Sequence, residues 1–245
     1  MTIKRILSAA LPLLGMLSAC DRSDPPSERL ERAAEELVSD VENEALPTQR
    51  PDGPWAPRND CAELPGASAF LASLKSAIDA RDADALVALT AEDVKLDFGG
   101  GAGADKLRER LAANDGAHWE TLARLLDLGC ATSNETSLTL PWYFAQTIPV
   151  DPYMGAIVTG EDVSLHDAPD TDAPVLATIS WDAVERLPDD TAREGFERVA
   201  WIKPKSEERV EGYIAGAELR GLIDYRLIAN RRNNRWRITA LIAGD

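Results

Sequence analysis

Apolar positions recur at helical spacing through the first half of the chain. From Ala67 to Ala80 the apolar residues share one helical face, at positions Ala67, Phe70, Leu71, Leu74 and Ile78. Asp82 suits the N-cap of a second helix, which runs through Leu89. Further helices are predicted over residues 104–113 and around residues 119–126. The pattern therefore predicts a largely helical region.

Apolar and polar residues alternate elsewhere, which predicts strands. Residues 94–98 alternate before the glycine-rich run Gly99–Gly103, and residues 137–144 are strand-like. Near the end of the chain, Tyr225–Ala229 and Trp236–Ile242 flank Asn233-Asn234, a dipeptide that favours a hairpin turn. The helical region and these strands together indicate an α+β protein.

Residues 155–220 have a different pattern, in which short strands are broken by turn residues. Small all-β barrels have this pattern. Trp181, Trp201 and Tyr213 fall inside this segment. We expect Trp201 to belong to the barrel core. Trp181, Tyr213 and His166 are a candidate partner-binding set, because exposed aromatic residues form platforms for extended ligands. Burial in the core is the alternative for Trp181 and Tyr213, and a surface or boundary position without a ligand is the alternative for His166.

The first nineteen residues have the pattern of a secretory signal peptide. Lys4 and Arg5 precede an apolar run from Ile6 to Ala19 that is too short to span a membrane. The run ends in Leu17-Ser18-Ala19-Cys20, which resembles a bacterial lipobox. The resemblance implies that Cys20 becomes the acylated N-terminus of the mature chain. An ordinary signal peptide followed by a chance cysteine is the alternative.

Acylation of Cys20 would leave an even pair of cysteines. In an exported, oxidising setting we predict that Cys61 and Cys130 form a disulfide, and two buried free thiols are the alternative. Asp21 follows the lipid-bearing cysteine, and by resemblance to the enterobacterial sorting rule this favours the inner membrane over the outer.

Residues 20–59 are rich in proline and are predicted to form a tether that holds one short helix. Its apolar positions lie on one face, at Leu30, Ala33, Ala34, Leu37, Val38 and Val41. Two heptads are too few for a stable coiled coil, so a solvated stalk helix is favoured over a docking helix.

Charge narrows the choice of partners. The 245-residue chain has a formal net charge of −16, and loss of Lys4 and Arg5 with the leader makes it −18. An acidic protein of this kind is a poor match for nucleic acid, whose binding depends on Lys and Arg. Arg231, Arg232, Arg235 and Arg237 form the one local basic cluster. We expect them to pair with the acidic segment 189–197, and lipid phosphates are the alternative.

Residues 70–111, "FLASLKSAIDARDADALVALTAEDVKLDFGGGAGADKLRERL", resemble the opening of the ketosteroid-isomerase-like, or nuclear-transport-factor-two-like, cone fold. The hairpin in residues 224–245 resembles the closing hairpin of the same family. The resemblance implies a cavity that could bind a small molecule or hold an active site. Such a function would require converging acids or a histidine in the cavity, for example Asp97 or His118 facing inward.

The barrel segment resembles a bacterial SH3-like domain. The resemblance is carried by Val163–Pro169, Val175–Ile179, Ala200–Lys203 and Gly212–Ile214. A glycine usual in the family is missing near Trp181, and residues 189–197 form a longer acidic insertion. The family implies peptidoglycan stem peptides or another envelope protein as the partner.

These patterns predict five segments. They are a signal peptide (1–19), a lipid-anchored tether (20–59), a helical α+β domain (60–150), an SH3-like barrel (151–222) and a C-terminal β-hairpin (223–245) that completes one of the two domains. The barrel is then either inserted into the first domain or extended by the hairpin, and we favour insertion.

Candidate chemistry is sparse. Gly99–Gly103 is better explained as a structural turn than as an anion-binding loop. The two histidines, His118 and His166, match no catalytic or zinc motif. We therefore predict no catalytic residues, metal or cofactor. The predicted function is non-enzymatic display of the SH3-like module on the periplasmic side of a bacterial membrane, and ligand binding or catalysis in the helical half is the alternative.

Overall fold

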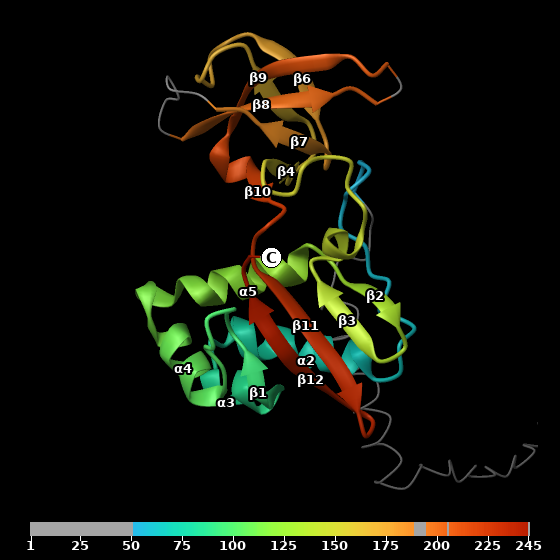
Figure 1. The fold of residues 1–245 in the computed structure, drawn as a ribbon, viewed down its shortest axis with the longest axis vertical. Helices are drawn as coiled ribbons and strands as arrows, with labels where there is room; N and C mark the ends of the chain where they lie inside the picture. Colours follow the sequence, from blue (N-terminus) through green and yellow to red (C-terminus); the bar gives the residue numbers. More distant parts are fainter. Residues whose placement is uncertain (1–50, 189–194, 205, 245) are drawn as a thin grey trace, which may run out of the picture. The chain divides into compact units, whose positions relative to one another are not determined.

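The computed structural model describes residues 51–188, 195–204 and 206–244. The predicted signal peptide, Cys20 and most of the tether lie outside the described residues. Within them, a few helices accompany two mostly antiparallel sheets, so the predicted α+β class is confirmed. Figure 1 shows the helices beside the sheet that holds the C-terminal hairpin.

The first sheet has five strands in the order β1-β12-β11-β3-β2. Its strands are β1 (Thr90–Lys95), β2 (Ala131–Asn134), β3 (Ser137–Leu140), β11 (Arg226–Arg232) and β12 (Arg235–Ile242). The helices of this half are α2 (Ala67–Asp79), α3 (Ala83–Ala88), α4 (Ala104–Ala112) and α5 (Ala117–Asp127), with the short 3-10 turns η1 (Asn114–Gly116) and η2 (Trp142–Ala145). The predicted helices therefore form close to their predicted bounds.

Local chemistry explains several boundaries. The Asp82 carboxylate accepts hydrogen bonds from the N–H groups of Asp84 and Ala85, both at 3.0 Å, and this caps α3 as predicted. The strand predicted over residues 94–98 instead spans Thr90–Lys95, because Asp97 turns back to accept hydrogen bonds from backbone N–H groups. Pro141 has no N–H to donate, and β3 ends just before it.

The C-terminal hairpin completes the first sheet rather than the second. β11 pairs with β12 and β3, and β12 also pairs in parallel with β1. Asn233 and Asn234 both have positive φ, 51° and 59°, as the predicted tight turn requires. In sequence, the second sheet is therefore inserted between β3 and β11.

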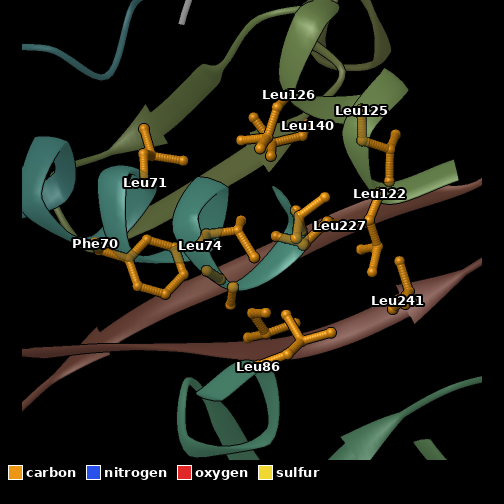
Figure 2. Packing of buried hydrophobic residues seen from close by; sticks show 14 of the residues in the cluster. Phe70, Leu71, Leu74, Leu86, Leu122, Leu125, Leu126, Leu140, Leu227 and Leu241 are labelled. Carbon is orange, nitrogen blue, oxygen red and sulfur yellow. The ribbon is translucent and has the colours of Figure 1, made fainter. Parts of the chain in front are cut away.

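The core of this half is filled with leucine. Figure 2 shows side chains from helices and strands meeting there, among them Leu74, Leu122 and Leu227. All three are at most 1% exposed. Burying an aliphatic side chain contributes about 1.5–3 kcal/mol. This packing joins the C-terminal hairpin to helices that precede it by more than a hundred residues.

The second sheet has seven strands in the order β10-β4-β7-β8-β9-β5-β6. They are β4 (Gly155–Val158), β5 (Val163–His166), β6 (Val175–Ile179), β7 (Ala183–Arg186), β8 (Phe196–Ile202), β9 (Arg209–Ala215) and β10 (Leu219–Gly221), with the 3-10 turn η3 (Gly216–Glu218) before β10. They surround one apolar core that includes Trp201, as predicted for that residue.

The predicted barrel is not closed. β10 is three residues long and pairs with β4 alone, while β6 pairs with β5 alone, so the two outer strands of the sheet do not meet. The link between β5 and β9 is a single pair, His166 with Tyr213. After β10 ends at Gly221, the chain continues into the hairpin of the first sheet.

A third apolar cluster draws on both halves. It contains Trp142 and Tyr143 from η2 together with Ile157 and Ala183 from the second sheet. The segment before the first helix also reaches it, because Trp55 packs against this cluster. The last residues of the predicted tether are therefore part of the folded body.

The cysteines Cys61 and Cys130 form a disulfide in the structure, with their Cα atoms 5.8 Å apart. Both are fully buried. Asn59 forms a β-bridge with Cys130, and the Asp60 carboxylate accepts a 2.6 Å hydrogen bond from the Trp142 indole N–H. The bond therefore fixes the N-terminal segment to the end of α5 and the start of β2.

Candidate docking groove

Alternation along β8 and β9 gives the second sheet an inner and an outer face. Val199 and Trp201 point into the core, and the Trp201 indole donates a 2.8 Å hydrogen bond to Asp182. Ala200 and Ile202 alternate with them and therefore lie on the outer face. Ile202 is 48% exposed.

A groove of about 630 Å³ lies on this outer face. The strands β7, β8 and β9 supply one part of its lining, with Ala183, Glu185, Ala200, Ile202 and Arg209. The rest comes from segments between strands and from the N-terminal segment, with Pro54, Trp55, Pro149, Val150, Asp151, Asp182, Lys203, Pro204 and Glu207. The lining thus combines four small or aliphatic side chains, three prolines and a tryptophan with six charged side chains.

The N-terminal wall of the groove is held by backbone contacts. Trp55 donates its N–H to the Trp181 carbonyl at 2.9 Å, and Asp52 donates its N–H to the Glu161 carboxylate at 2.8 Å. Gly53 has a φ of 131°, and a Cβ there would lie 2.2 Å from the Ser180 carbonyl oxygen. Only glycine allows the segment to approach the sheet this closely.

Both cations in the groove lining are paired with carboxylates. Arg209 lies 2.9 Å from Glu185 and 3.3 Å from Glu211, and Lys203 lies 3.0 Å from Glu208. The two glutamates raise the pKa of Arg209, which keeps its positive charge. The groove is therefore suited to an extended, mainly apolar or proline-containing segment, which needs no large opposing charge.

The predicted partner-binding residues do not form one platform. Trp181 is half-buried against the third apolar cluster, and its backbone, with a φ of 44°, receives the Trp55 N–H. His166 and Tyr213 pair across β5 and β9 instead. His166 is only 8% exposed, and its Nδ1 lies 2.9 Å from the Ala173 carbonyl oxygen. Its ring also meets Phe196 edge-on, so His166 has a packing role in this structure.

The sequence reasoning missed the residues that line the groove. The high proline content of residues 20–59 places Trp55 and Pro54 in the predicted tether. A tryptophan in such a segment is a signal for docking, since large aromatic residues are seldom left in solvent. Ile202 could have been recognised from β8 itself, where it follows Trp201 with the opposite orientation.

In the helical half, the glycine-rich run holds the protein's own carboxylate. Gly99 and Gly101 donate their N–H groups to Asp97 Oδ1 at 2.8 and 2.7 Å, and Arg110 pairs with Asp97 Oδ2. The Gly101 hydrogen bond is the main reason that the pKa of Asp97 is lowered. The run is therefore a carboxylate-capped turn, and Asp97 already has partners.

His118 lies next to Tyr225, with their Nε2 and hydroxyl oxygen 3.4 Å apart and the rings in an edge-on contact. Burial is the main cause that lowers the pKa of His118, and the charge of Arg110 adds to it. Neither Asp97 nor His118 lines the groove or the two smaller pockets. The leucine core occupies the interior of this half.

Tyr143 lies beside a smaller pocket of about 380 Å³, which is lined mainly by apolar side chains of residues 143–152 and 222–226. Burial raises the pKa of Tyr143 to about 12. Its neighbour Arg226 stacks on Phe144, with the guanidinium carbon 4.3 Å from the ring centre. The pocket is thus bordered by a neutral phenol and a stacked cation.

The described residues contain no cluster of three His, Cys, Asp or Glu side chains that could hold a metal ion. No helix in the same residues is both long and apolar enough to cross a bilayer. The predicted signal peptide and Cys20 lie outside the described residues.

The expected pairing of the hairpin arginines with segment 189–197 can be followed at Glu197 alone, because residues 189–194 lie outside the described residues. Glu197, at the described end of the acidic insertion, pairs with Arg186. Arg231 donates to the Pro65 carbonyl at 3.2 Å, and Arg237 donates to the Trp236 carbonyl at 3.2 Å. Glu197 lies on β8 of the second sheet, whereas the hairpin belongs to the first sheet.

Comparison with known proteins yields distant likeness only. No protein-family model and no curated protein matches the chain. A solved structure titled Rd1NTF2_05, with five named substitutions, is 11% identical, covers 73% of this chain and 96% of its own, and has a TM-score of 0.27. A protein of unknown function with a cystatin-like fold from Nostoc punctiforme is 10% identical over 76% of this chain and 91% of its own, with a TM-score of 0.26. The comparisons give no evidence for an SH3-like or lipoprotein family.

Proposed function

We propose that this protein is a non-enzymatic, lipid-anchored protein of the bacterial cell envelope that binds an extended segment of a periplasmic partner in the groove of its second sheet. In this proposal Cys20 carries the lipid and residues 20–50 connect the membrane to the folded body. The partner is an envelope protein or a peptidoglycan stem peptide, and nucleic acid is not a partner.

The observation that carries the proposal is the exposure of Ile202 inside a groove bordered by prolines and Trp55. An exposed aliphatic side chain within a concave, mainly apolar surface is typical of a binding site. Proline-rich segments dock in grooves that present aromatic side chains, because their extended conformation is already formed before binding. The apolar lining favours a protein segment over a stem peptide, because stem peptides carry several charged groups.

Photo-crosslinking in intact cells tests the groove directly. A photoreactive amino acid replaces Ile202 in one variant and Val175, which lies on β6 away from the groove and is 52% exposed, in the matched control. We expect an adduct to one envelope component from position 202 and none from position 175. Equal adducts from both positions, or none from position 202, would contradict the groove as the binding site.

A charge substitution provides the matching binding measurement. Ile202→Asp places a carboxylate in the apolar lining and should weaken capture of the crosslinked partner by about tenfold, whereas Val175→Asp should leave it unchanged. Both side chains are exposed, so both variants should unfold at the wild-type temperature. The same pair of variants, tested for binding to purified sacculi, separates a peptidoglycan partner from a protein partner.

The anchor has a separate test. Cys20→Ala should abolish acylation and release or mislocalise the protein. Mass spectrometry of the mature N-terminus and membrane fractionation are the measurements. If the mature wild-type N-terminus carries no lipid and Cys20→Ala associates with the membrane as the wild type does, the proposed anchor is refuted. The proposed groove does not depend on this result.

A further inference from the structure

The outer face of the first sheet carries a group of cations, here called the cationic face: Lys95 on β1, Arg232 on β11, and Arg235 and Arg237 on β12. Three of them line a shallow pocket of about 220 Å³ together with Ala91, Asp93, Asn230 and Thr239. Asp93 is the one carboxylate in that lining. The lining is thus polar and carries a net positive charge.

These four cations have no carboxylate partner among the described residues. Cations of the second sheet behave differently, since Arg186, Arg198 and Arg209 each pair with a glutamate. In a chain with a net charge of −16, unpaired arginines on one face are a marked local excess. Carboxylates are abundant, so this arrangement does not follow from a shortage of them.

The hairpin register makes this excess unfavourable for folding. Arg232 lies directly opposite Arg235, and Arg237 lies two residues farther along the same face of β12. Like charges directly opposite each other in a sheet are destabilising. A local rule that is broken with no gain in folding marks a functional surface more often than a structural one.

We propose that the cationic face rests on anionic phospholipid headgroups, an inference that depends on the proposed lipid anchorage at Cys20. Anchorage keeps the body near the bilayer, which raises the effective concentration of headgroups at this face. The rest of the acidic body is repelled by an anionic leaflet, so this face is the side that can approach it. Ala91 is the only apolar side chain in the pocket lining, which suits contact with phosphates rather than insertion into lipid.

The proposal also explains the geometry of the face. Its arginines lie on a sheet surface beside the hairpin turn, where Arg232 and Arg235 are exposed. Guanidinium groups bind phosphate oxygens in pairs, which suits headgroups better than a compact ammonium does. The acidic segment of residues 28–44 in this same chain could bind the cationic face in place of headgroups. The experiment below distinguishes the segment from the headgroups.

The experiment couples the mature chain, residues 20–245, through the Cys20 thiol to maleimide lipid in vesicles. Cys61 and Cys130 are bonded to each other and do not compete. One set of vesicles is phosphatidylcholine, and the other contains about 30% phosphatidylglycerol, which supplies the anionic surface. Phenylglyoxal modification is then followed by peptide mass spectrometry at Arg232, Arg235 and Arg237. Arg124, an exposed arginine of α5, is the internal reference.

We expect modification of Arg232 and Arg235 to slow about fivefold or more on anionic vesicles, with Arg124 unchanged. About 0.5 M salt should remove the protection, because it screens exposed charges. The variant Arg232→Gln/Arg235→Gln should lose protection at Arg237, whereas the matched Arg124→Gln should keep it. The double variant removes a repulsive pair, so its unfolding temperature should equal or exceed that of the wild type.

Equal modification on the two kinds of vesicle would overturn the proposal. Protection that is present on both and disappears when the acidic residues of 28–44 are changed to Gln or Asn would also overturn it and assign the face to that segment. Because the coupling is chemical, failure here is distinct from failure of acylation in cells. If the cationic face is protected on anionic vesicles but Cys20 is not acylated in cells, the proposed membrane role of this face is also overturned.

Discussion

The N–H of Trp55 donates a 2.9 Å hydrogen bond to the carbonyl oxygen of Trp181, which joins the start of the folded body to the second sheet. The contact depends on Gly53, where a Cβ would lie 2.2 Å from the Ser180 carbonyl oxygen. A residue predicted to bind a partner through its ring therefore has a backbone role in building the groove.

Gly53→Ala should detach this segment. The new Cβ meets backbone atoms, and the φ of 131° is strained for any other residue, so we expect a loss of about 2–4 kcal/mol in the free energy of unfolding. Gly100→Ala is the matched control, since Gly100 has a φ of 98° but no atom within 4 Å of a Cβ. Urea titration measures both, and a Gly53→Ala cost no greater than the control would show that the contact is dispensable.

Removing the disulfide should destabilise the whole protein. Cys61→Ala/Cys130→Ala opens a loop that spans 69 positions, which should cost about 2–5 kcal/mol. Reductant should lower the stability of the wild type by a similar amount and leave the double variant unchanged. A wild type whose urea midpoint is insensitive to reductant would contradict a bond between these two residues.

Leu74→Ala should be severe because Leu74 is fully buried in the core of the first sheet. We expect a loss of about 2–5 kcal/mol from lost transfer energy and a residual cavity. Leu176→Ala, at a position that is 45% exposed, should stay within about 0.5 kcal/mol of the wild type. Calorimetry of the two variants side by side measures the difference.

His118 should make stability fall on mild acidification. Its pKa is lowered by burial in the folded state, so the unfolded chain binds a proton first as the pH falls below the ordinary histidine value of 6.5. Stability is thus full above that value and declines until the folded histidine also titrates. His118→Gln should flatten this part of the curve of unfolding temperature against pH, and an unchanged slope would assign it to other groups.

Tyr143 should make the free energy of unfolding fall at alkaline pH. Burial raises its pKa from 10.0 to about 12, so the unfolded tyrosine loses its proton first as the pH rises through 10. The stabilising contribution is complete below pH 10 and decreases up to about pH 12. Tyr143→Phe should reduce the alkaline slope of the free energy of unfolding, and a slope identical to that of the wild type would show that Tyr143 is not its source.

Sequence patterns were most reliable where the signal was local. The apolar face of α2, the Asp82 cap and the Asn233-Asn234 turn each depend on neighbours within a few residues, and all three form as predicted. The predicted end of β1 was wrong because the Asp97 carboxylate accepts hydrogen bonds from N–H groups of the glycine turn, and the strand ends before Asp97. Side-chain hydrogen bonding of this kind competes with strand pairing and leaves little trace in hydrophobic periodicity.

Long-range relationships were harder to foresee. The open second sheet results from the short β10, whose length depends on where the chain must leave for the hairpin. The groove joins Trp55 to strands that follow it by more than a hundred residues, and no local pattern encodes that contact. The sequence predicts an accessible His166. In the structure its ring is buried, and the chain turns so that the Ala173 carbonyl oxygen contacts its Nδ1.

The order of strands in the first sheet has a consequence for biosynthesis. β1 and β3 precede their partners β12 and β11 in the chain, and the whole second sheet lies between them in sequence. As the chain is delivered from its N-terminus, the helical half therefore keeps part of its apolar surface uncovered until the residues that follow the second sheet arrive. A stop codon before residue 226 would remove two central strands of the earliest half, so a truncated product should be degraded rather than persist as a smaller folded protein.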